Sequence, residues 1–439
     1  MTLPALHADT RQLPCGDRAA NQVLAERLQW IARGTTVAFL VAWGVWFFPF
    51  DDSLDRRGTP LGADYAMFYA AGRSVLDGAA DRLYDQAAHQ QRLAEIFPKI
   101  DRSFSLPYRY PPCVALLAAP LAALPYPLSF GLFFLSSSAA WCAAVWLAVR
   151  DLPALCGPWR RAVLWGLAGW PVAWETLFGG QASTFAALFF SSALALIRRR
   201  RFAAAGVALA MAAYKPNVLA VAGLGLLLRY PRLLRGLLPA AAGLVLLSLV
   251  PGGWAALRDY GELACRLAAQ PWDVETPHWK VHGLAVWLAA LPGGWGRISS
   301  LAAGIAAAAA VAWQWRRSRV QPLAFAWASS LLISINALCN PYTPIYDLLL
   351  LSFGALLVAE ALAAEHGADI SGRRGTAELL LAAVYFGPHL SQGVAQAAGF
   401  QPFPAVLLGI SLWQARQLVR LGSPPVPQLT RQPAWPTAG

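Results

Sequence analysis

Long apolar runs recur along the chain from residue 30 to residue 420, separated by short polar segments. An α-helix needs about 20 apolar residues to cross the hydrocarbon core of a bilayer, and most of these runs approach that length. The pattern predicts an all-α polytopic membrane protein with about 12 transmembrane helices. The runs lie at residues 30–50, 127–149, 162–178, 181–197, 202–228, 236–251, 298–315, 320–339, 348–364, 377–391 and 403–420.

The composition supports this class. Of the 439 residues, 57% are hydrophobic and 13% are charged, whereas an average soluble domain carries about 25% charged residues. The 19 Trp and 12 Tyr suit a chain with two membrane–water interfaces, where amphipathic rings collect. These proportions exclude a soluble enzyme, a secreted disulfide scaffold and a disordered chain. The six cysteines lack CxxC spacing, which argues against a metal or redox site built on them.

The net charge of +12 comes from short arginine clusters between apolar runs, which is typical of cytoplasmic loops. A nucleic-acid-binding protein would instead gather its basic residues on one surface. Placing every cluster in the cytoplasm gives twelve spans with both termini inside, under three conditions. The run 111–125 must not cross the membrane and is expected to be an outer-leaflet or re-entrant helix. The run 202–228 must break into two short helices at Lys215-Pro216, and the run 283–291 must stay outside. The predicted outer segment 51–110 then holds eight basic and nine acidic residues, consistent with a position outside the cytoplasm.

Four parts of the chain follow from this topology. Residues 1–29 form a cytoplasmic segment before an uncleaved first span. Residues 30–365 form the transmembrane core, with a first outer loop at 51–126 that carries juxtamembrane helices. Residues 366–420 add C-terminal transmembrane helices, and the Pro-rich residues 421–439 are expected to be a disordered cytoplasmic tail. The alanine- and arginine-rich composition is typical of a GC-rich bacterial genome, so we expect an inner-membrane protein.

Polar motifs interrupt the apolar pattern at the predicted outer face. Asp64 precedes an amphipathic stretch, 65–77, that contains Arg73. Its carboxylate has two interpretations that spacing does not separate. It caps a helix N-terminus, or it acts as a general base on a substrate held at the membrane surface.

Two further motifs carry cations. Arg109-Tyr110 precedes two prolines, so it is either a rigid turn with an interfacial aromatic or a site at which the arginine holds a phosphate. Lys215 is the only lysine in any apolar run. An ammonium group there either snorkels to the interface or meets a partner such as a phosphate.

The remaining motifs combine acidic, amide and imidazole groups. Glu175 lies within an apolar run, one turn before Gly179-Gly180-Gln181, and acidic residues in such runs are rare and often functional. Tyr346-Asp347 begins a predicted span, where the carboxylate could bind a sugar hydroxyl or a cation. His278 and His282 are four residues apart, but a metal site needs a helix and a third ligand, and Pro277 favours a loop.

The chain lacks a Walker-type loop and a GxGxxG motif. A nucleotide sugar therefore has no binding domain here, and no cofactor or divalent metal is implied. A transferase acting at the outer face would need a donor already carried across the membrane on a lipid.

In its order of motifs, the chain resembles the GT-C superfamily of polyprenyl-phosphate-sugar-dependent glycosyltransferases, and in particular glycosyltransferase family 87. That family includes polyprenol-phosphate-mannose-dependent mannosyltransferases. Four stretches carry the resemblance: Asp64 through Asp85, Tyr110-Pro111-Pro112 with Leu124-Pro125, Gly180-Gln181 through Lys215-Pro216, and Asn340-Pro341-Tyr342 through Leu348.

The resemblance implies an inverting hexosyltransferase, with mannose as the expected sugar and a lipid or glycan as the acceptor. Asp64 matches the position of the family's general base, and Lys215 matches a lysine expected at the donor phosphate. The active site then faces the periplasm or the outside. The other expected substrate-binding residues are Arg109, Tyr110, Gln181, Arg73, Glu175, Tyr346, Asp347 and His282.

Two other functions stay open at this point. In a multi-pass transporter or a lipid or sugar flippase, Glu175, Lys215 and Asp347 would line a pathway. A catalytically silent partner in envelope polysaccharide synthesis would keep the fold without needing Asp64 or Lys215. Donor-dependent transfer by the purified protein separates these alternatives from the enzyme.

Overall fold

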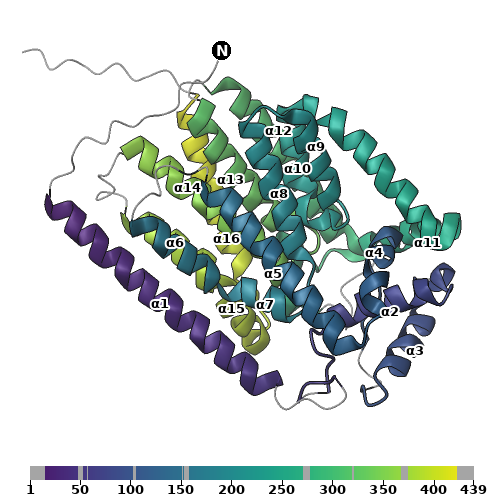
Figure 1. Ribbon diagram of the computed structural model, residues 1–439. Helices are drawn as coiled ribbons and strands as arrows, with labels where there is room; N and C mark the ends of the chain where they lie inside the picture. The colour runs from purple at the N-terminus through teal and green to yellow at the C-terminus, as the bar shows by residue number, and fades with distance from the viewer. Residues whose placement is uncertain are drawn as a thin grey trace, which may run out of the picture.

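A computed structural model describes residues 15–47, 53–56, 58–101, 105–150, 152, 158–269, 277–318, 321–366 and 374–422 (Figure 1). Within these ranges the regular elements are helices, as the hydrophobic pattern predicts. The α-helices are α1 (Cys15–Phe47), α2 (Tyr65–Leu76), α3 (Gln86–Ile96), α4 (Pro112–Ala122), α5 (Tyr126–Arg150), α6 (Pro158–Ala168), α7 (Pro171–Phe178), α8 (Ser183–Arg198), α9 (Phe202–Ala212), α10 (Pro216–Arg229), α11 (Leu234–Ala269), α12 (Trp295–Arg317), α13 (Gln321–Cys339), α14 (Leu350–His366), α15 (Arg374–Ala398) and α16 (Phe403–Arg420).

Five helical stretches of the described chain are long and apolar enough to cross a membrane. This confirms a polytopic, all-helical membrane protein, while the count of twelve spans stays a prediction. The five stretches are Tyr126–Arg150, Pro231–Leu267, Trp295–Arg317, Gln321–Cys339 and Ile345–Leu362.

Helix α13 lies at the centre of the main bundle (Figure 1). It packs against α10, α12, α14 and α16, and every residue from Ala324 to Cys339 is buried. A helix that is buried on all sides has neighbours around its whole circumference, as in the core of a large protein. The loop that follows α13 therefore starts from a rigid support.

The break expected in one apolar run is present, and two further runs form only short helical segments. The run 111–125 contains α4, a helix of 11 residues with Pro120 inside it, which is short for a membrane span. The run 202–228 divides into α9 and α10 at Lys215, and Pro216 occupies the first turn of α10. In the run 283–291 only the short 3-10 turn Leu284–Val286 forms.

The structure corrects three expected boundaries. The run 162–178 is two helices, α6 and α7, because Trp170 is extended before Pro171 and the proline cannot donate to the preceding turn. Helix α11 continues to Ala269 through a kink at Gly252–Gly253, so much of the expected outer loop after residue 251 is helical. Helix α1 begins at Cys15, inside the segment expected to precede the first span.

The segment between α1 and α5 has a hydrophobic core of its own, built on α2, α3, α4 and the start of α5. Its members include the aromatic residues Tyr65, Phe68, Phe97, Tyr108 and Tyr126. Helices α2 and α4 pack closely at Gly72, where an added Cβ would lie 2.8 Å from the Cβ of Ala122. This packing fixes α2, and with it the residue that begins the helix, Asp64.

Candidate active site

Asp64 lies where α2 begins, against the end of α7. Its backbone N–H donates to the carbonyl of Gly179 at 3.0 Å. The residue has helical backbone angles, φ −69° and ψ −17°, and its side chain makes no capping hydrogen bond. The capping interpretation is therefore wrong. The carboxylate, which is partly exposed, instead accepts a hydrogen bond from Nε2 of Gln181.

The Gly179-Gly180 turn makes this contact possible. Gly180 has φ +67°, and a Cβ at this position would meet the backbone of Gly62 and the side chain of Tyr65. Only glycine combines this backbone conformation with so close an approach. The turn therefore brings Gln181 beside Asp64, although the two residues are 117 positions apart in the chain.

Gln181 joins the carboxylate to a buried lysine. Its carbonyl oxygen Oε1 accepts hydrogen bonds from the Tyr110 hydroxyl and from Nζ of Lys215, both at 3.3 Å. Its amide nitrogen donates to Asp64. The side chain is 2% exposed, so these partners satisfy it in place of water.

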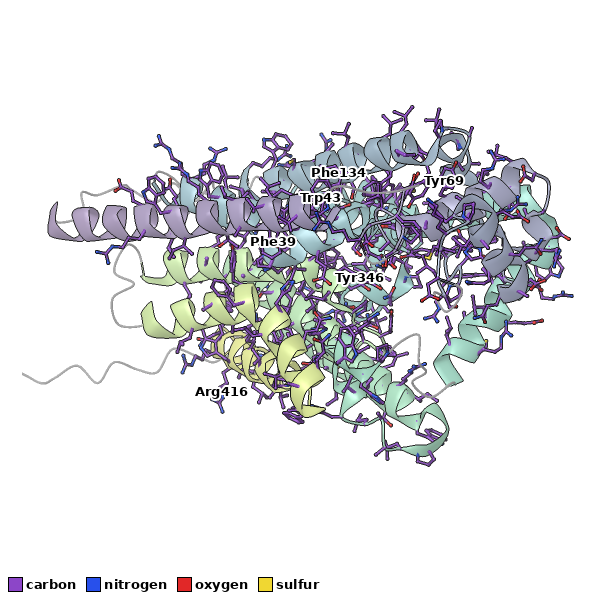
Figure 2. The ribbon with its side chains drawn as sticks, turned by 90° about the horizontal axis from the view of Figure 1, so that it is seen from below. Phe39, Trp43, Tyr69, Phe134, Tyr346 and Arg416 are labelled. Carbon is purple, nitrogen blue, oxygen red and sulfur yellow. The ribbon has the colours of Figure 1, made fainter. Side chains whose placement is uncertain are left out.

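Lys215 is 4% exposed and lies at the break between α9 and α10. Its Nζ lies 2.5 Å from Oδ1 of Asp347, 2.7 Å from Oγ of Ser183 and 3.3 Å from Oε1 of Gln181. The ring of Tyr346 covers it, with Nζ 4.5 Å from the ring centroid (Figure 2 labels Tyr346). The snorkelling interpretation is wrong, because the ammonium group turns into the protein. Each of its three N–H groups already has an acceptor in the protein. Contact between Lys215 and the phosphate of the sugar donor therefore stays a prediction.

Polar groups from three helices hold this ion pair. Oδ1 of Asp347 also accepts from Ser183 Oγ at 2.8 Å, and Oδ2 accepts from Asn217 Nδ2 at 2.8 Å. Directly after α13, Asn340 donates to the carbonyl of Asn217. One turn earlier, Asn336 accepts from the backbone N–H groups of Val221 and Ala222. Ser183 and Asn336 were not among the predicted site residues, although an asparagine inside an apolar helix is a signal for such a contact.

A second polar pair lies on the α7 side of Asp64. Nε2 of His389, on α15, lies 2.8 Å from Oε2 of Glu175. The two side chains are 30% and 39% exposed, and the histidine ring meets Phe39 of α1 edge-on at 6.3 Å (Figure 2 labels Phe39). The sequence analysis missed His389, because nothing in its neighbourhood in the chain connects it to Glu175.

Two surface cations also lie near the site. Lys280 ends the 3-10 turn His278–Lys280 and is exposed. An antiparallel bridge between Val281 and Pro344 holds this turn against the loop that follows α13. Arg109 is half-buried, and its charge lowers the pKa of Tyr342, which burial raises.

Two predicted residues have other partners. His282 is fully buried, with Nε2 3.2 Å from the carbonyl oxygen of Pro388, so it does not face a substrate; burial lowers its pKa to about 4. Arg73 lies nine residues along α2 from Asp64, about 13 Å away, and faces Asp77. His278 and His282 share no helix, and the described residues contain no group of three side chains suited to a metal ion.

Several groups act on the ionisation of Asp64, and they act in opposite directions. Burial raises the pKa of Asp64 above its ordinary value of 3.8, and the charge of Glu175 raises it further. The hydrogen bond from Gln181 and the charges of Lys215 and Lys280 act in the opposite direction. A carboxylate with a raised pKa is a stronger proton acceptor, and it remains ionised at neutral pH while its pKa stays below 7.

Comparison with known proteins identifies the family. The family model for glycosyltransferase family 87 matches residues 108–341, more than half of the 439 residues. The chain belongs to glycosyltransferase family 87. The matched region contains Arg109, Tyr110, Glu175, Gln181 and Lys215. Asp64 and Asp347, at the two ends of the hydrogen-bonded network, lie outside it. No curated protein matches this sequence. No solved structure matches it either.

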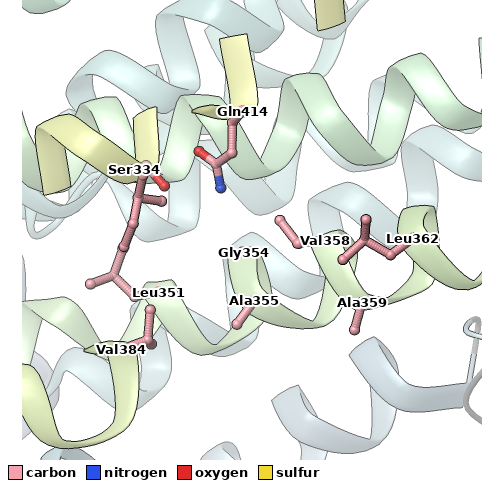
Figure 3. A pocket seen from close by; sticks show the side chains of 10 residues that line it. Ser334, Leu351, Gly354, Ala355, Val358, Ala359, Leu362, Val384 and Gln414 are labelled. Atoms are coloured by element: carbon pink, nitrogen blue, oxygen red, sulfur yellow. The ribbon is translucent and has the colours of Figure 1, made fainter. Parts of the chain in front are cut away.

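A small cavity of about 40 Å³ in this family 87 protein lies apart from these groups (Figure 3). Helices α13, α14, α15 and α16 line it with mostly apolar side chains, among them Leu351, Val358 and Val384. Its polar lining is Ser334 and Gln414, and none of the predicted site residues borders it. The cavity therefore has no part in the chemistry considered below.

Proposed function

We propose that this membrane glycosyltransferase moves a hexose, with mannose as the first candidate, from a polyprenyl-phosphate sugar to a lipid or glycan acceptor, with inversion at the anomeric carbon. The observation that carries the proposal is the partly exposed carboxylate of Asp64, joined through Gln181 to the buried Lys215–Asp347 pair. Burial of charged groups in a membrane protein is costly, so such a constellation is expected at a functional site.

Asp64 acts as the general base in this reaction. One carboxylate oxygen accepts the Gln181 N–H, and the other takes the proton of the acceptor hydroxyl as its oxygen attacks the anomeric carbon. The bond from that carbon to the phosphate oxygen breaks, and the electron pair leaves with the polyprenyl phosphate. A phosphate leaves without a protein acid, so one carboxylate is sufficient, whereas a retaining glycosidase needs two carboxylates about 5 Å apart. We propose no metal or cofactor.

The leaving phosphate needs positive charge close to the reacting carbon. The three donors of Lys215 are occupied, so we place the phosphate near Arg109 and Lys280, whose charges act on Tyr342 and Asp64 respectively. Lys215 lies behind Gln181 and contributes positive potential to the same region. Fixed positive charge close to a developing phosphate dianion stabilises the transition state.

Arg109→Gln and Lys280→Gln are each expected to raise the KM for the donor by about ten-fold, because each removes a charge-assisted contact worth about 1.5–3 kcal/mol. The KM for the acceptor is expected to change far less. Initial rates at varied donor and acceptor concentrations measure both constants. Arg92→Gln is the matched control, since Arg92 pairs with Asp77 and Glu95 on the outer segment. An unchanged donor KM in both variants would remove these cations from the phosphate site.

We place the site at the periplasmic face of a bacterial inner membrane, with twelve spans and both termini in the cytoplasm. Residues 30–365 remain the proposed core, with outer loop 51–126. The C-terminal helices 366–420 contribute to the site as well, because His389 pairs with Glu175.

Single cysteines in a cysteine-free variant test this orientation. A cysteine at Gln91, exposed on α3, is expected to react with a membrane-impermeant maleimide in intact spheroplasts. A cysteine at Arg199, exposed at the end of α8, is expected to react only after the membrane is opened. The reverse pattern would place the site in the cytoplasm.

The activity itself is tested with purified protein, a panel of radiolabelled polyprenyl-phosphate hexoses and a total lipid extract. Transfer of label to a new lipid or glycan identifies the sugar and the acceptor class. If no donor is consumed and reconstituted vesicles instead accumulate an intact lipid-linked sugar, the transferase proposal fails and a flippase takes its place.

A further inference from the structure

The amide of Gln181 has one allowed orientation. Its oxygen accepts from the ammonium group of Lys215 and from the hydroxyl of Tyr110, and its nitrogen donates to Asp64. A flipped amide would bring its NH2 group against the Lys215 ammonium, where donor would meet donor. It would also bring its oxygen against the carboxylate of Asp64, where acceptor would meet acceptor.

Lys215 cannot move away to relieve such a flip. Asp347 and Ser183 hold its Nζ at 2.5 Å and 2.7 Å, and the ring of Tyr346 packs against it. The lysine is therefore a fixed charge, and its effect on the reaction passes through the oxygen of Gln181. A buried polar network of this kind orients its members because an unsatisfied group would be costly.

We propose that Gln181 is a positioning residue for transfer. Locked by Lys215 and Tyr110, it binds one oxygen of the Asp64 carboxylate and turns the other oxygen to the acceptor hydroxyl. This inference rests on the proposed role of Asp64 as the base.

The consequence for pH dependence has a definite sign. The hydrogen bond from Gln181 favours the charged form of Asp64 and opposes the effect of burial on its pKa. Removing the bond is expected to raise the pKa of Asp64. The acidic limb of the pH–activity profile then lies at a higher pH than in the wild type. A substitution of Gln181 leaves the other charged or titratable groups around Asp64 in place, so any shift in the pH profile reports on residue 181. These groups are Glu175, Lys215, Lys280, Tyr110, Tyr126, Tyr342 and Tyr346.

The decisive experiment compares kcat against pH for the wild type and Gln181→Leu, with donor and acceptor saturating. We expect kcat at neutral pH to fall about ten- to hundred-fold and the acidic limb to move up by about one pH unit or more. The KM for the donor is expected to stay within about three-fold, because the side chain acts on the base and not on the phosphate. A fall in kcat with an unmoved acidic limb would overturn the proposal, because the lost hydrogen bond would then have no effect on the ionisation of Asp64.

A second variant covers the case in which leucine at this buried position prevents folding. Gln181→Glu keeps an oxygen for Lys215 and Tyr110 but turns a second carboxylate to Asp64. The repulsion is expected to move the acidic limb upward as well, and a limb at the wild-type position would overturn the proposal. Gln91→Leu is the matched control, because Gln91 bonds to Glu95 on the exposed face of α3. Its profile is expected to match the wild type.

Asp64→Asn, assayed in parallel, separates the two levels of the argument. Transfer by the wild type and none by Asp64→Asn establishes the base, so an unmoved limb then counts against Gln181 alone. Transfer by Asp64→Asn at the wild-type rate would overturn the proposed base together with the inference.

Discussion

Replacing Asp64 by asparagine is expected to lower the transfer rate by about 10³-fold or more while the protein stays folded, since general-base catalysis contributes about 10²–10⁴-fold. Asparagine has nearly the same size and can still face Gln181, but it cannot take the proton of the acceptor hydroxyl. The side chain is partly exposed and does not cap α2, so the substitution costs little stability. Single-turnover transfer from a radiolabelled donor measures the loss.

Asp85→Asn is the matched control for this variant. Asp85 lies on the same outer segment, caps α3 by accepting from the backbone N–H of Ala88 at 3.1 Å, and pairs with Arg82 at 2.8 Å. Asparagine is an equally good cap, so the control is expected to keep its activity. If both variants lose activity equally, the loss would come from disturbance of the outer segment and not from a missing base.

Lys215→Met is expected to have the largest effect on stability. It leaves the Asp347 carboxylate, 6% exposed, without its cation. Breaking a buried pair by removing one partner costs about 3–5 kcal/mol, a large part of the marginal stability of a folded protein. We expect a lower yield of monodisperse protein in detergent and a lower melting temperature, measured by size-exclusion chromatography and by thermal unfolding.

The double variant Lys215→Met with Asp347→Asn tests the cause of that loss. Asparagine at 347 can donate to Ser183 and accept from Asn217, so the site again has no unpaired charge. Most of the lost stability is expected to return. Activity is not expected to return, because Gln181 has still lost the ammonium group that orients it. A single variant as stable as the wild type would show that the pair does not support the fold.

Much of the architecture could be predicted from the chain alone, since local physical constraints determine it. The lengths of the apolar runs indicate membrane helices, Pro216 divides 202–228, and the motifs around Gln181 and Lys215 point to the family that the comparison confirms. The boundaries that differ follow from features with weaker local signals. The split at Trp170 and the kinked continuation of α11 through Gly252–Gly253 are examples.

The sequence by itself determined which uncommon residues an apolar chain retains: one lysine within its apolar runs, a few carboxylates and a Gly-Gly-Gln turn. Only the tertiary structure decided what each of them does. Spacing along the chain carries no information on the distance between Asp64 and Gln181 or on the pairing of Lys215 with Asp347. Asp347 also lies outside the region that the family model matches. Those contacts form because helices that are distant in sequence pack side by side, and a buried charge is stable only where that packing supplies its partner.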